Sequence, residues 1–226
     1  LPWRLDWPAR WYWLGVTCEP FGKDHAAAGG SYDTSSRIIR EVLDRKPPEP
    51  VVYEWIQLKG KGAMSSSSGV VVSGVDMLNM TPPEVLRFLI ARNQPTRHID
   101  MDPGLGILNL VDDFDRYEKE FVEKDEDESE KGDRKRTFEL SMVDPLNLQF
   151  TADITQVPYR HLVTLVQLSE GFDNLLDMVL RTEGLGSLND ISLKRLQQRV
   201  TSVKFWIDHY APDGVKFTLF DSPPKE

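Results

Sequence analysis

The feature that most constrains the fold is a strand–helix–strand pattern near the start of the sequence. VTCEPFG predicts a buried strand over about 16–21, TSSRIIREVLD predicts an amphipathic helix, and VVYEWIQL (51–58) is a β-rich run. Two strands joined through a helix form a right-handed crossover and pair in parallel. We therefore predict an α/β region, whose ligands bind beyond the carboxyl ends of the strands.

Two polar loops follow the two predicted strands. GKDHAAAGG (22–30) comes after the first strand, and GKGAMSSSSG (60–69) comes after the second. Gly and Ser without periodicity are typical of a flexible linker, but the carboxyl end of a parallel strand is where a nucleotide would bind. We predict that the two loops meet at one edge of the sheet and hold phosphate between them.

An aromatic segment precedes the first predicted strand. DWPARWYWLG predicts a helix over about 7–14, because Asp6 can cap it, Pro8 suits its first turn and Gly15 suits the position after its last residue. The tryptophans of this helix are expected to pack in a core.

Helical periodicity dominates the chain after about residue 81. TPPEVLRFLIAR carries a Thr81-x-x-Glu84 capping box, and the longest helical pattern runs from Asp190 to about Tyr210. The predicted fold class is therefore α/β followed by all-α. Bases scattered over these helices are candidates for phosphate contacts or plain surface residues: Arg87, Arg92, Arg97, Arg160, Lys194, Arg195 and Arg199.

Charge and cysteine content exclude several classes of protein. The formal net charge of −9 argues against nonspecific binding of nucleic acid by the chain alone. Twelve acidic and four basic residues lie between Asp112 and Asp133, and we interpret about 119–136 as an exposed acidic insertion. The single cysteine, Cys18, excludes an internal disulfide and a multi-cysteine zinc site, so no metal site is predicted. With no apolar run long enough for a bilayer and no leader, we expect a cytoplasmic protein without membrane contact.

Three segments in this order and spacing resemble one family. PWRLDWPARWYWLGVTCEPFGKDH, YEWIQLKGKGAMSSSSG and TPPEVLRFLIAR are similar to the second half of class I lysyl-tRNA synthetases, which are widespread in archaea. The resemblance is dense over about 1–110 and continues to about 213. It implies the second half of a split Rossmann-type parallel sheet at 1–80. A helical stem-contact region and the start of a helical anticodon-binding domain would follow at 81–226. The family's HIGH motif belongs to a first half that this sequence lacks.

The resemblance implies a catalytic loop. MSSSSG resembles the family's KMSKS motif, with Ala63 where the first lysine would stand and Ser66 or Ser68 where the second would stand. Lys59 and Lys61 lie close enough in sequence to reach phosphates in their place. The implied catalytic set is Lys61, Met64, Ser65, Ser66, Ser67 and Ser68.

The resemblance also implies binding residues. ATP would contact Gly22, Asp24, His25, Met64 and Ser65. Lysine needs an apolar slot for its stem and an acid for its ammonium group; the candidates are Trp3, Asp6, His25 and Tyr53. Asp6 is an alternative helix cap, and Glu19 or Glu54 could replace it as the charge partner.

The implied function is ATP-dependent ligation of lysine to tRNA-Lys, with ATP and Mg²⁺ as the substrate complex and no tightly bound cofactor in this chain. The isolated chain is expected to be inactive or nearly so, because half of the nucleotide site is missing. Two alternatives remain open: another class I synthetase, for glutamate or cysteine, and a non-catalytic tRNA-binding paralogue.

Overall fold

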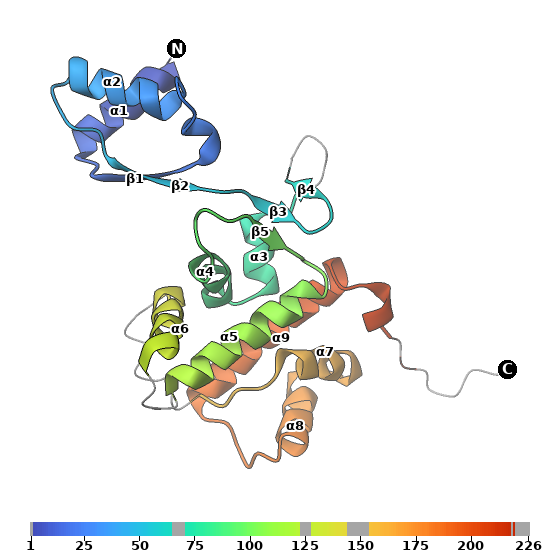
Figure 1. The fold of residues 1–226 in the computed structure, drawn as a ribbon. Helices are drawn as coiled ribbons and strands as arrows, with labels where there is room; N and C mark the ends of the chain where they lie inside the picture. Colours follow the sequence, from blue (N-terminus) through green and yellow to red (C-terminus); the bar gives the residue numbers. More distant parts are fainter. Residues whose placement is uncertain (1, 65–70, 123–127, 144–153, 218, 220–226) are drawn as a thin grey trace. The chain divides into compact units, whose positions relative to one another are not determined.

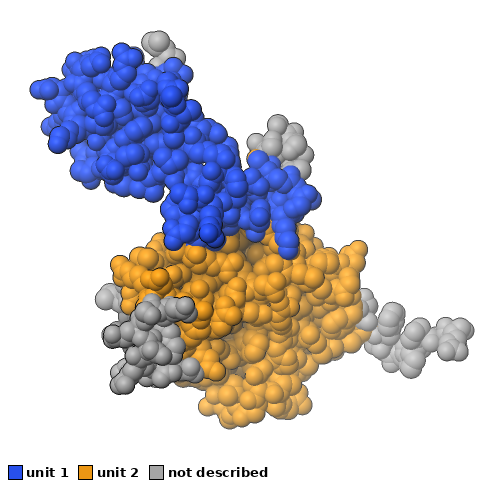
Figure 2. Space-filling model, viewed as in Figure 1, with its two compact units in different colours: residues 1–63, 93–100 blue, residues 64–92, 101–226 orange. Residues whose placement is uncertain are grey.

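The computed structural model describes residues 2–64, 71–122, 128–143, 154–217 and 219. Contacts divide the chain into two compact units, which Figure 2 colours separately. Unit 1 comprises Leu1–Ala63 and Asn93–Asp100, and unit 2 comprises Met64–Arg92 and Met101–Glu226. Among the described residues, the strands lie in the smaller unit apart from Met101 at the end of the last one, and helices make up most of the larger unit.

Unit 1 contains the predicted strand–helix–strand crossover (Figure 1). Strand β1 (Cys18–Gly22), helix α2 (Ser31–Glu41) and strand β2 (Glu49–Tyr53) follow helix α1 (Pro2–Leu14). The two strands pair in parallel, in register from Cys18 opposite Glu49 to Gly22 opposite Tyr53. The prediction of a parallel pair is therefore confirmed. A core of buried side chains from α1, β1 and α2 supports it: Trp7, Trp11, Phe21 and Ile39.

Helix α1 is longer than predicted at its N-terminal end. It begins at Pro2, so Asp6 lies inside the helix and forms an ion pair with Arg10, with 2.8 Å between Oδ2 and Nε. The interpretation of Asp6 as a helix cap is therefore wrong. The C-terminal end matches the prediction, because Gly15 has φ 63° and the Val16 N–H donates to the Trp11 carbonyl at 3.0 Å. This is the bond that closes a Schellman motif.

The run VVYEWIQL forms two strands in two different sheets. Strand β2 ends at Tyr53, and β3 (Ile56–Leu58) joins β4 (Gly62–Ala63) and β5 (Ile99–Met101) in a sheet of order β4-β3-β5. The backbone N–H of Glu54 donates to the Pro95 carbonyl at 2.8 Å, so a segment distant in sequence takes over the pairing after Tyr53. The prediction that loop 60–69 follows a strand of the parallel sheet is therefore wrong.

Unit 2 is built from helices that mostly match the predicted periodicities. They are α3 (Gly74–Met80), α4 (Pro83–Ala91), α5 (Gly106–Val122), α6 (Glu128–Ser141), α7 (Tyr159–Leu168), α8 (Phe172–Thr182) and α9 (Asp190–His209). Two short 3₁₀ helices complete the described structure, η1 (Lys23–His25) in unit 1 and η4 (Asp213–Val215) in unit 2. No helix was predicted at 128–136, where α6 begins.

The capping box lies one helix earlier than predicted. The Thr81 hydroxyl donates to the Met77 carbonyl at the end of α3, and Pro82 precedes α4 without a side-chain cap. The reciprocal pair is instead Ser73 and Asp76 at the start of α3. The Thr81–Glu84 capping box is therefore wrong, because the hydroxyl closes the preceding helix.

Most candidate phosphate-binding arginines of unit 2 have partners within the protein. Arg87 donates to the carbonyls of Leu140 and Ser141, and Arg92 pairs with Asp113. Arg199 is 1% exposed and donates to both oxygens of the Asp115 carboxylate. These contacts join α4 to α6 and α5, and α9 to α5, so the side chains mainly hold helices together.

Candidate functional site

A cavity of about 420 Å³ in unit 1 lies at the carboxyl ends of the parallel strands. Gly22 and Tyr53, the last residues of β1 and β2, are register partners and both line it. Its other lining residues are Trp3, Trp7, Glu19, Pro20, Phe21, Lys23, Asp24, His25, Glu54, Trp55 and Ile56. Ligands of parallel sheets bind at this edge, which makes the cavity the candidate site.

Aromatic rings from α1 and the first polar turn form one wall. The rings of Trp3 and Trp7 stack with 5.0 Å between their centroids, and the His25 ring meets both edge-on at 5.6 and 5.8 Å. Trp7 is buried, whereas Trp3 and Tyr53 are 47% and 46% exposed. Half-exposed rings beside a buried one offer flat apolar surface to a ligand.

The carboxylate of Glu19 is held by two tryptophans. The Trp7 and Trp11 indole N–H groups donate to its two oxygens at 3.1 and 2.8 Å. Both donors are neutral, and no ion pair of Glu19 occurs among the residues that the structure describes. Glu19 therefore brings to the cavity a negative charge without a cationic partner in the described part of the chain.

Glu54, the second acid of the cavity, does have a cation. Lys23 Nζ lies 2.7 Å from Glu54 Oε2, and His98 Nδ1 lies 3.4 Å from the same oxygen. The pKa of Glu54 is lowered from its ordinary value, chiefly by the hydrogen bond from Lys23 and further by the nearby charges, against a smaller effect of burial. Glu54 is therefore ionised at neutral pH.

The structure brings five predicted site residues together at this cavity: Trp3, Gly22, Asp24, His25 and Tyr53. Asp6 does not line it and is paired with Arg10. Met64 belongs to unit 2, and Ser65, Ser66, Ser67 and Ser68 lie outside the described residues. Sequence reasoning missed Lys23, although its position directly after the end of a predicted strand was a usable signal.

Lys61 lies in the turn between β3 and β4. Its N–H donates to the Leu58 carbonyl at 2.9 Å, and Gly60 and Gly62 both have φ 75°. A positive φ at the third residue of such a turn favours glycine. The sequence LKGKG therefore forms a hairpin turn, and neither Lys59 nor Lys61 lines the cavity.

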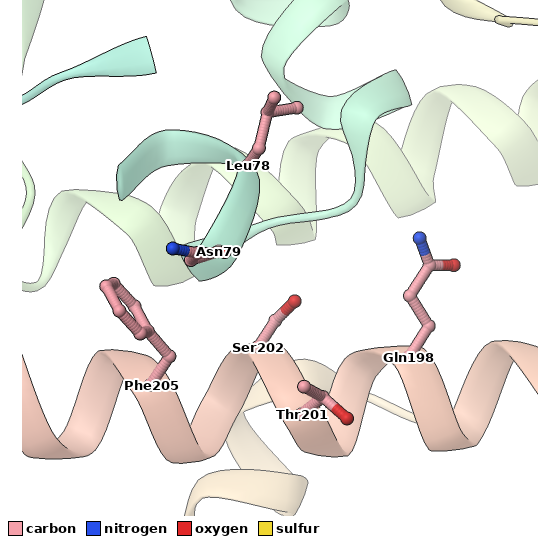
Figure 3. Close-up of a pocket in the computed structure, with 6 residues that line it drawn as sticks. All are labelled: Leu78, Asn79, Gln198, Thr201, Ser202 and Phe205. Atoms are coloured by element: carbon pink, nitrogen blue, oxygen red, sulfur yellow. The ribbon is translucent and has the colours of Figure 1, made fainter. Parts of the chain in front are cut away.

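Two cavities lined by described residues of unit 2 have another character. One of about 280 Å³ lies between α3 and α9 and has uncharged lining residues (Figure 3): Leu78, Asn79, Gln198, Thr201, Ser202 and Phe205. Another of about 400 Å³ is lined partly by Glu118 and Arg195, which pair with each other at 2.6 Å. Neither has the polar turn at strand ends that marks the cavity of unit 1.

The described residues show neither a metal-binding cluster nor a membrane-spanning helix. His, Cys, Asp and Glu side chains of the described residues do not gather into a group of three or more that could hold a metal ion. None of the helices in the described part of the chain has the length and apolar character that a membrane span requires.

Known proteins match nearly the whole chain. Residues 1–144 match the family model described as tRNA synthetases class I (K). A lysine–tRNA ligase of Thermoplasma volcanium is 46% identical over 219 residues, which cover 97% of this chain and 41% of the relative. Lysine–tRNA ligase 1 of Methanosarcina acetivorans is 46% identical over 226 residues, covering 99% and 40%. A lysine–tRNA ligase of Thermococcus kodakarensis is 40% identical over 231 residues, covering 100% and 43%. The chain thus spans about two fifths of the length of these relatives.

Proposed function

We propose that this chain, which belongs to the class I lysyl-tRNA synthetase family, is part of an enzyme that activates lysine with ATP and transfers it to tRNA-Lys. The observation that carries the proposal is the cavity at the carboxyl edge of β1 and β2, where aromatic walls and a carboxylate adjoin the polar turn GKDH. The chain covers 41% of its Thermoplasma volcanium relative, so the activity is proposed for the longer protein that contains it.

The proposed reaction has two steps. A carboxylate oxygen of lysine forms a bond to the α-phosphorus of ATP, the bond from that phosphorus to its bridging oxygen breaks, and pyrophosphate leaves with the electron pair. A ribose hydroxyl of the tRNA then attacks the acyl carbon of lysyl-adenylate, and AMP leaves. Both steps move negative charge, which positioned donors and cations stabilise. ATP enters as its Mg²⁺ complex.

In this proposal the turn after β1 holds the nucleotide. Gly22 has no side chain, which leaves room for close approach to the backbone, and Asp24 accepts from ribose hydroxyls. His25 faces the amino acid or the adenylate. Met64 and Ser65, in the KMSKS-like loop, would also contact ATP, as the family resemblance implies.

The lysine stem lies between Trp3 and Tyr53 in this proposal, and its ammonium group meets an acid. Asp6 is the weaker candidate, because it lies outside the cavity and already pairs with Arg10. Of the two acids in the cavity, Glu54 already holds Lys23. Glu19 is therefore the acid that we assign to the substrate ammonium group.

The rest of the catalytic set and the helical unit keep the roles that the family implies. The catalytic KMSKS-like loop would comprise Lys61, Met64, Ser65, Ser66, Ser67 and Ser68. The helices after about residue 81 would contact the stem of tRNA-Lys and begin the anticodon-side domain.

Exchange of labelled pyrophosphate into ATP tests the function. With the full-length protein that carries this sequence, we expect exchange that depends on lysine and not on glutamate or cysteine. The 226-residue chain alone is expected to give little or none. Exchange that depends on a different amino acid would reject lysine as the substrate. Tight tRNA binding without exchange for any amino acid would instead favour a non-catalytic paralogue.

Two variants of the full-length protein test the lysine slot. We expect Trp3→Ala and Glu19→Gln each to raise the KM for lysine by about 10-fold or more, because a lost apolar wall or charged partner costs about 1–3 kcal/mol. The KM for ATP should change little. Leu5→Ala is the matched control, because Leu5 is 52% exposed on the same helix and does not line the cavity. An equal rise in both KM values for Glu19→Gln would show that Glu19 only supports the fold.

A further inference from the structure

We propose that Lys23 is a cation that binds the phosphates of ATP during amino-acid activation, since Ala63 and Ser66 or Ser68 stand at the two lysine positions of the KMSKS-like motif. This proposal rests on the proposed function. It adds to the ATP site a residue, Lys23, that lies outside the KMSKS-like motif. Two observations support it: the motif lacks its two lysines, and Lys23 lines the cavity of unit 1.

The deficit concerns charge. The transition state of phosphoryl transfer spreads negative charge over the phosphate oxygens, and a positioned cation stabilises it. Ala63 and Ser66 or Ser68 stand where the loop would carry lysines. These two positions of the motif therefore supply no cation, and Lys23 would add one from the turn after β1.

Lys23 occupies a suitable position. It follows the last residue of β1 directly and opens η1, so its backbone is fixed at the carboxyl edge of the parallel pair. Its side chain lines the cavity together with Asp24 and His25. Lys59 and Lys61, the lysines nearest to the loop, lie in the β3–β4 turn or beside it and do not line the cavity. Among the residues that the structure describes, no other lysine or arginine lines this cavity.

Glu54 positions the Lys23 ammonium group and leaves N–H donors of that group available for a ligand. An ammonium group has three N–H donors, and the ion pair with Glu54 Oε2, with 2.7 Å between the two atoms, engages at most one of them. The Lys23 side chain is 41% exposed, so its remaining donors can reach a bound anion. Glu54 in turn is held through its backbone N–H by the Pro95 carbonyl. We therefore assign Glu54 as a positioning residue that aims Lys23 into the cavity.

The test uses full-length protein with Lys23→Met, which keeps the length of the stem and removes the charge. We expect the kcat of lysine-dependent pyrophosphate exchange to fall by about 10²–10³-fold, as for loss of one preorganised electrostatic donor. The KM for lysine should stay within about twofold, because Lys23 does not touch the amino acid in this proposal. Lys23→Arg should recover part of the rate. Lys46→Met is the matched control, since Lys46 is exposed in the segment before β2.

Three results would overturn the inference. The first is a Lys23→Met variant with kcat and KM for ATP within about threefold of the wild type. The second is an equal fall in rate for Lys46→Met. The third is a lower KM for lysine with unchanged kcat, which would mean that the Lys23 ammonium group competes with the substrate for Glu54.

The inference and the proposed function fail separately. If another amino acid supports exchange, the proposed function is wrong. The Lys23 variants are then compared with the wild type in exchange assays that use that amino acid. If no amino acid supports exchange, calorimetric titration with ATP and Mg²⁺ decides. A Kd for ATP raised about 10-fold in Lys23→Met supports the inference, and an unchanged Kd rejects it.

Discussion

Arg199→Ala is expected to lower the free energy of unfolding of the helical unit by about 3–5 kcal/mol, because it leaves a carboxylate without its cation in a largely buried site. The Arg199 guanidinium donates to both oxygens of Asp115 and, from Nη1, to the Val157 carbonyl at 2.9 Å. Its side chain is 2% exposed and that of Asp115 is 13% exposed. Both members of the pair are therefore held by partners within the protein.

The same network reaches a second arginine. Arg195 Nη1 lies 2.6 Å from Glu118 Oε1, and its Nη2 lies 3.7 Å from Asp115 Oδ1. Burial lowers the pKa of Arg199 and the attraction of Asp115 raises it, with a net rise, so the guanidinium stays charged. Removing the charge of Asp115 or of Arg199 therefore breaks several contacts between α5 and α9.

Urea unfolding followed by far-ultraviolet circular dichroism measures this effect. Arg160→Ala is the matched control, because Arg160 and Asp112 form a pair with 48% and 40% of their side chains exposed. Exposed pairs contribute about 0–1 kcal/mol. Equal losses for Arg199→Ala and Arg160→Ala would contradict the assignment of a buried network. The double variant Asp115→Ala, Arg199→Ala should lose less free energy of unfolding than the sum of the two single variants. In the double variant neither the carboxylate nor the guanidinium remains buried without its partner.

Trp11→Ala is expected to cost unit 1 about 3–5 kcal/mol, as for other large buried aromatic residues. Trp11 is 2% exposed, its ring centroid lies 4.8 Å from that of Trp7 and 5.6 Å from that of Tyr32, and its indole N–H donates to Glu19. Its removal opens a void in the core that joins α1 to β1. Lysine-dependent exchange should fall with the folded fraction, because the same strand ends in the cavity.

Trp13→Ala is the control for this prediction. Trp13 lies two positions along the same helix and is 77% exposed, so the prediction that it packs in a core is wrong. Its loss should therefore change stability by only about 0.5 kcal/mol. Trp11→Phe should fall between the two, because it keeps most of the packing and loses the hydrogen bond to Glu19. Thermal unfolding of the three variants, monitored by near-ultraviolet circular dichroism, gives the comparison. A Trp11→Ala variant as stable as Trp13→Ala would mean that this core does not hold unit 1 together.

The family and the local elements could be predicted from the sequence. The resemblance carried by the segments around GKDH and MSSSSG is confirmed by the family match over 1–144. The parallel pair of β1 and β2 was predictable because strand and helix periodicities are local properties of the chain. Gly15 was predictable for the same reason, since only the residues around it decide how the helix ends.

Pairings between distant segments could not be predicted. VVYEWIQL has no turn residue, so nothing local marks the change of sheet after Tyr53; the partner that causes it, Pro95, lies far along the chain. Thr81 matches a capping pattern, but its hydroxyl bonds to Met77 in the preceding helix. The position of Lys23 after a strand could be predicted, but its contact with Glu54 could not, because only the fold brings the two side chains together. The roles of Trp3, His25 and Tyr53 in binding stay predictions.

The exposure of strand β2 affects how the purified chain behaves in solution. All five of its residues are exposed, and the described sheet to which it belongs has only β1 beside it. Parallel sheets normally have both faces covered, and a bare strand edge is a template on which another molecule can add its own backbone. Self-association through Val51 and Val52 is therefore the hazard that purification of the 226-residue chain has to manage.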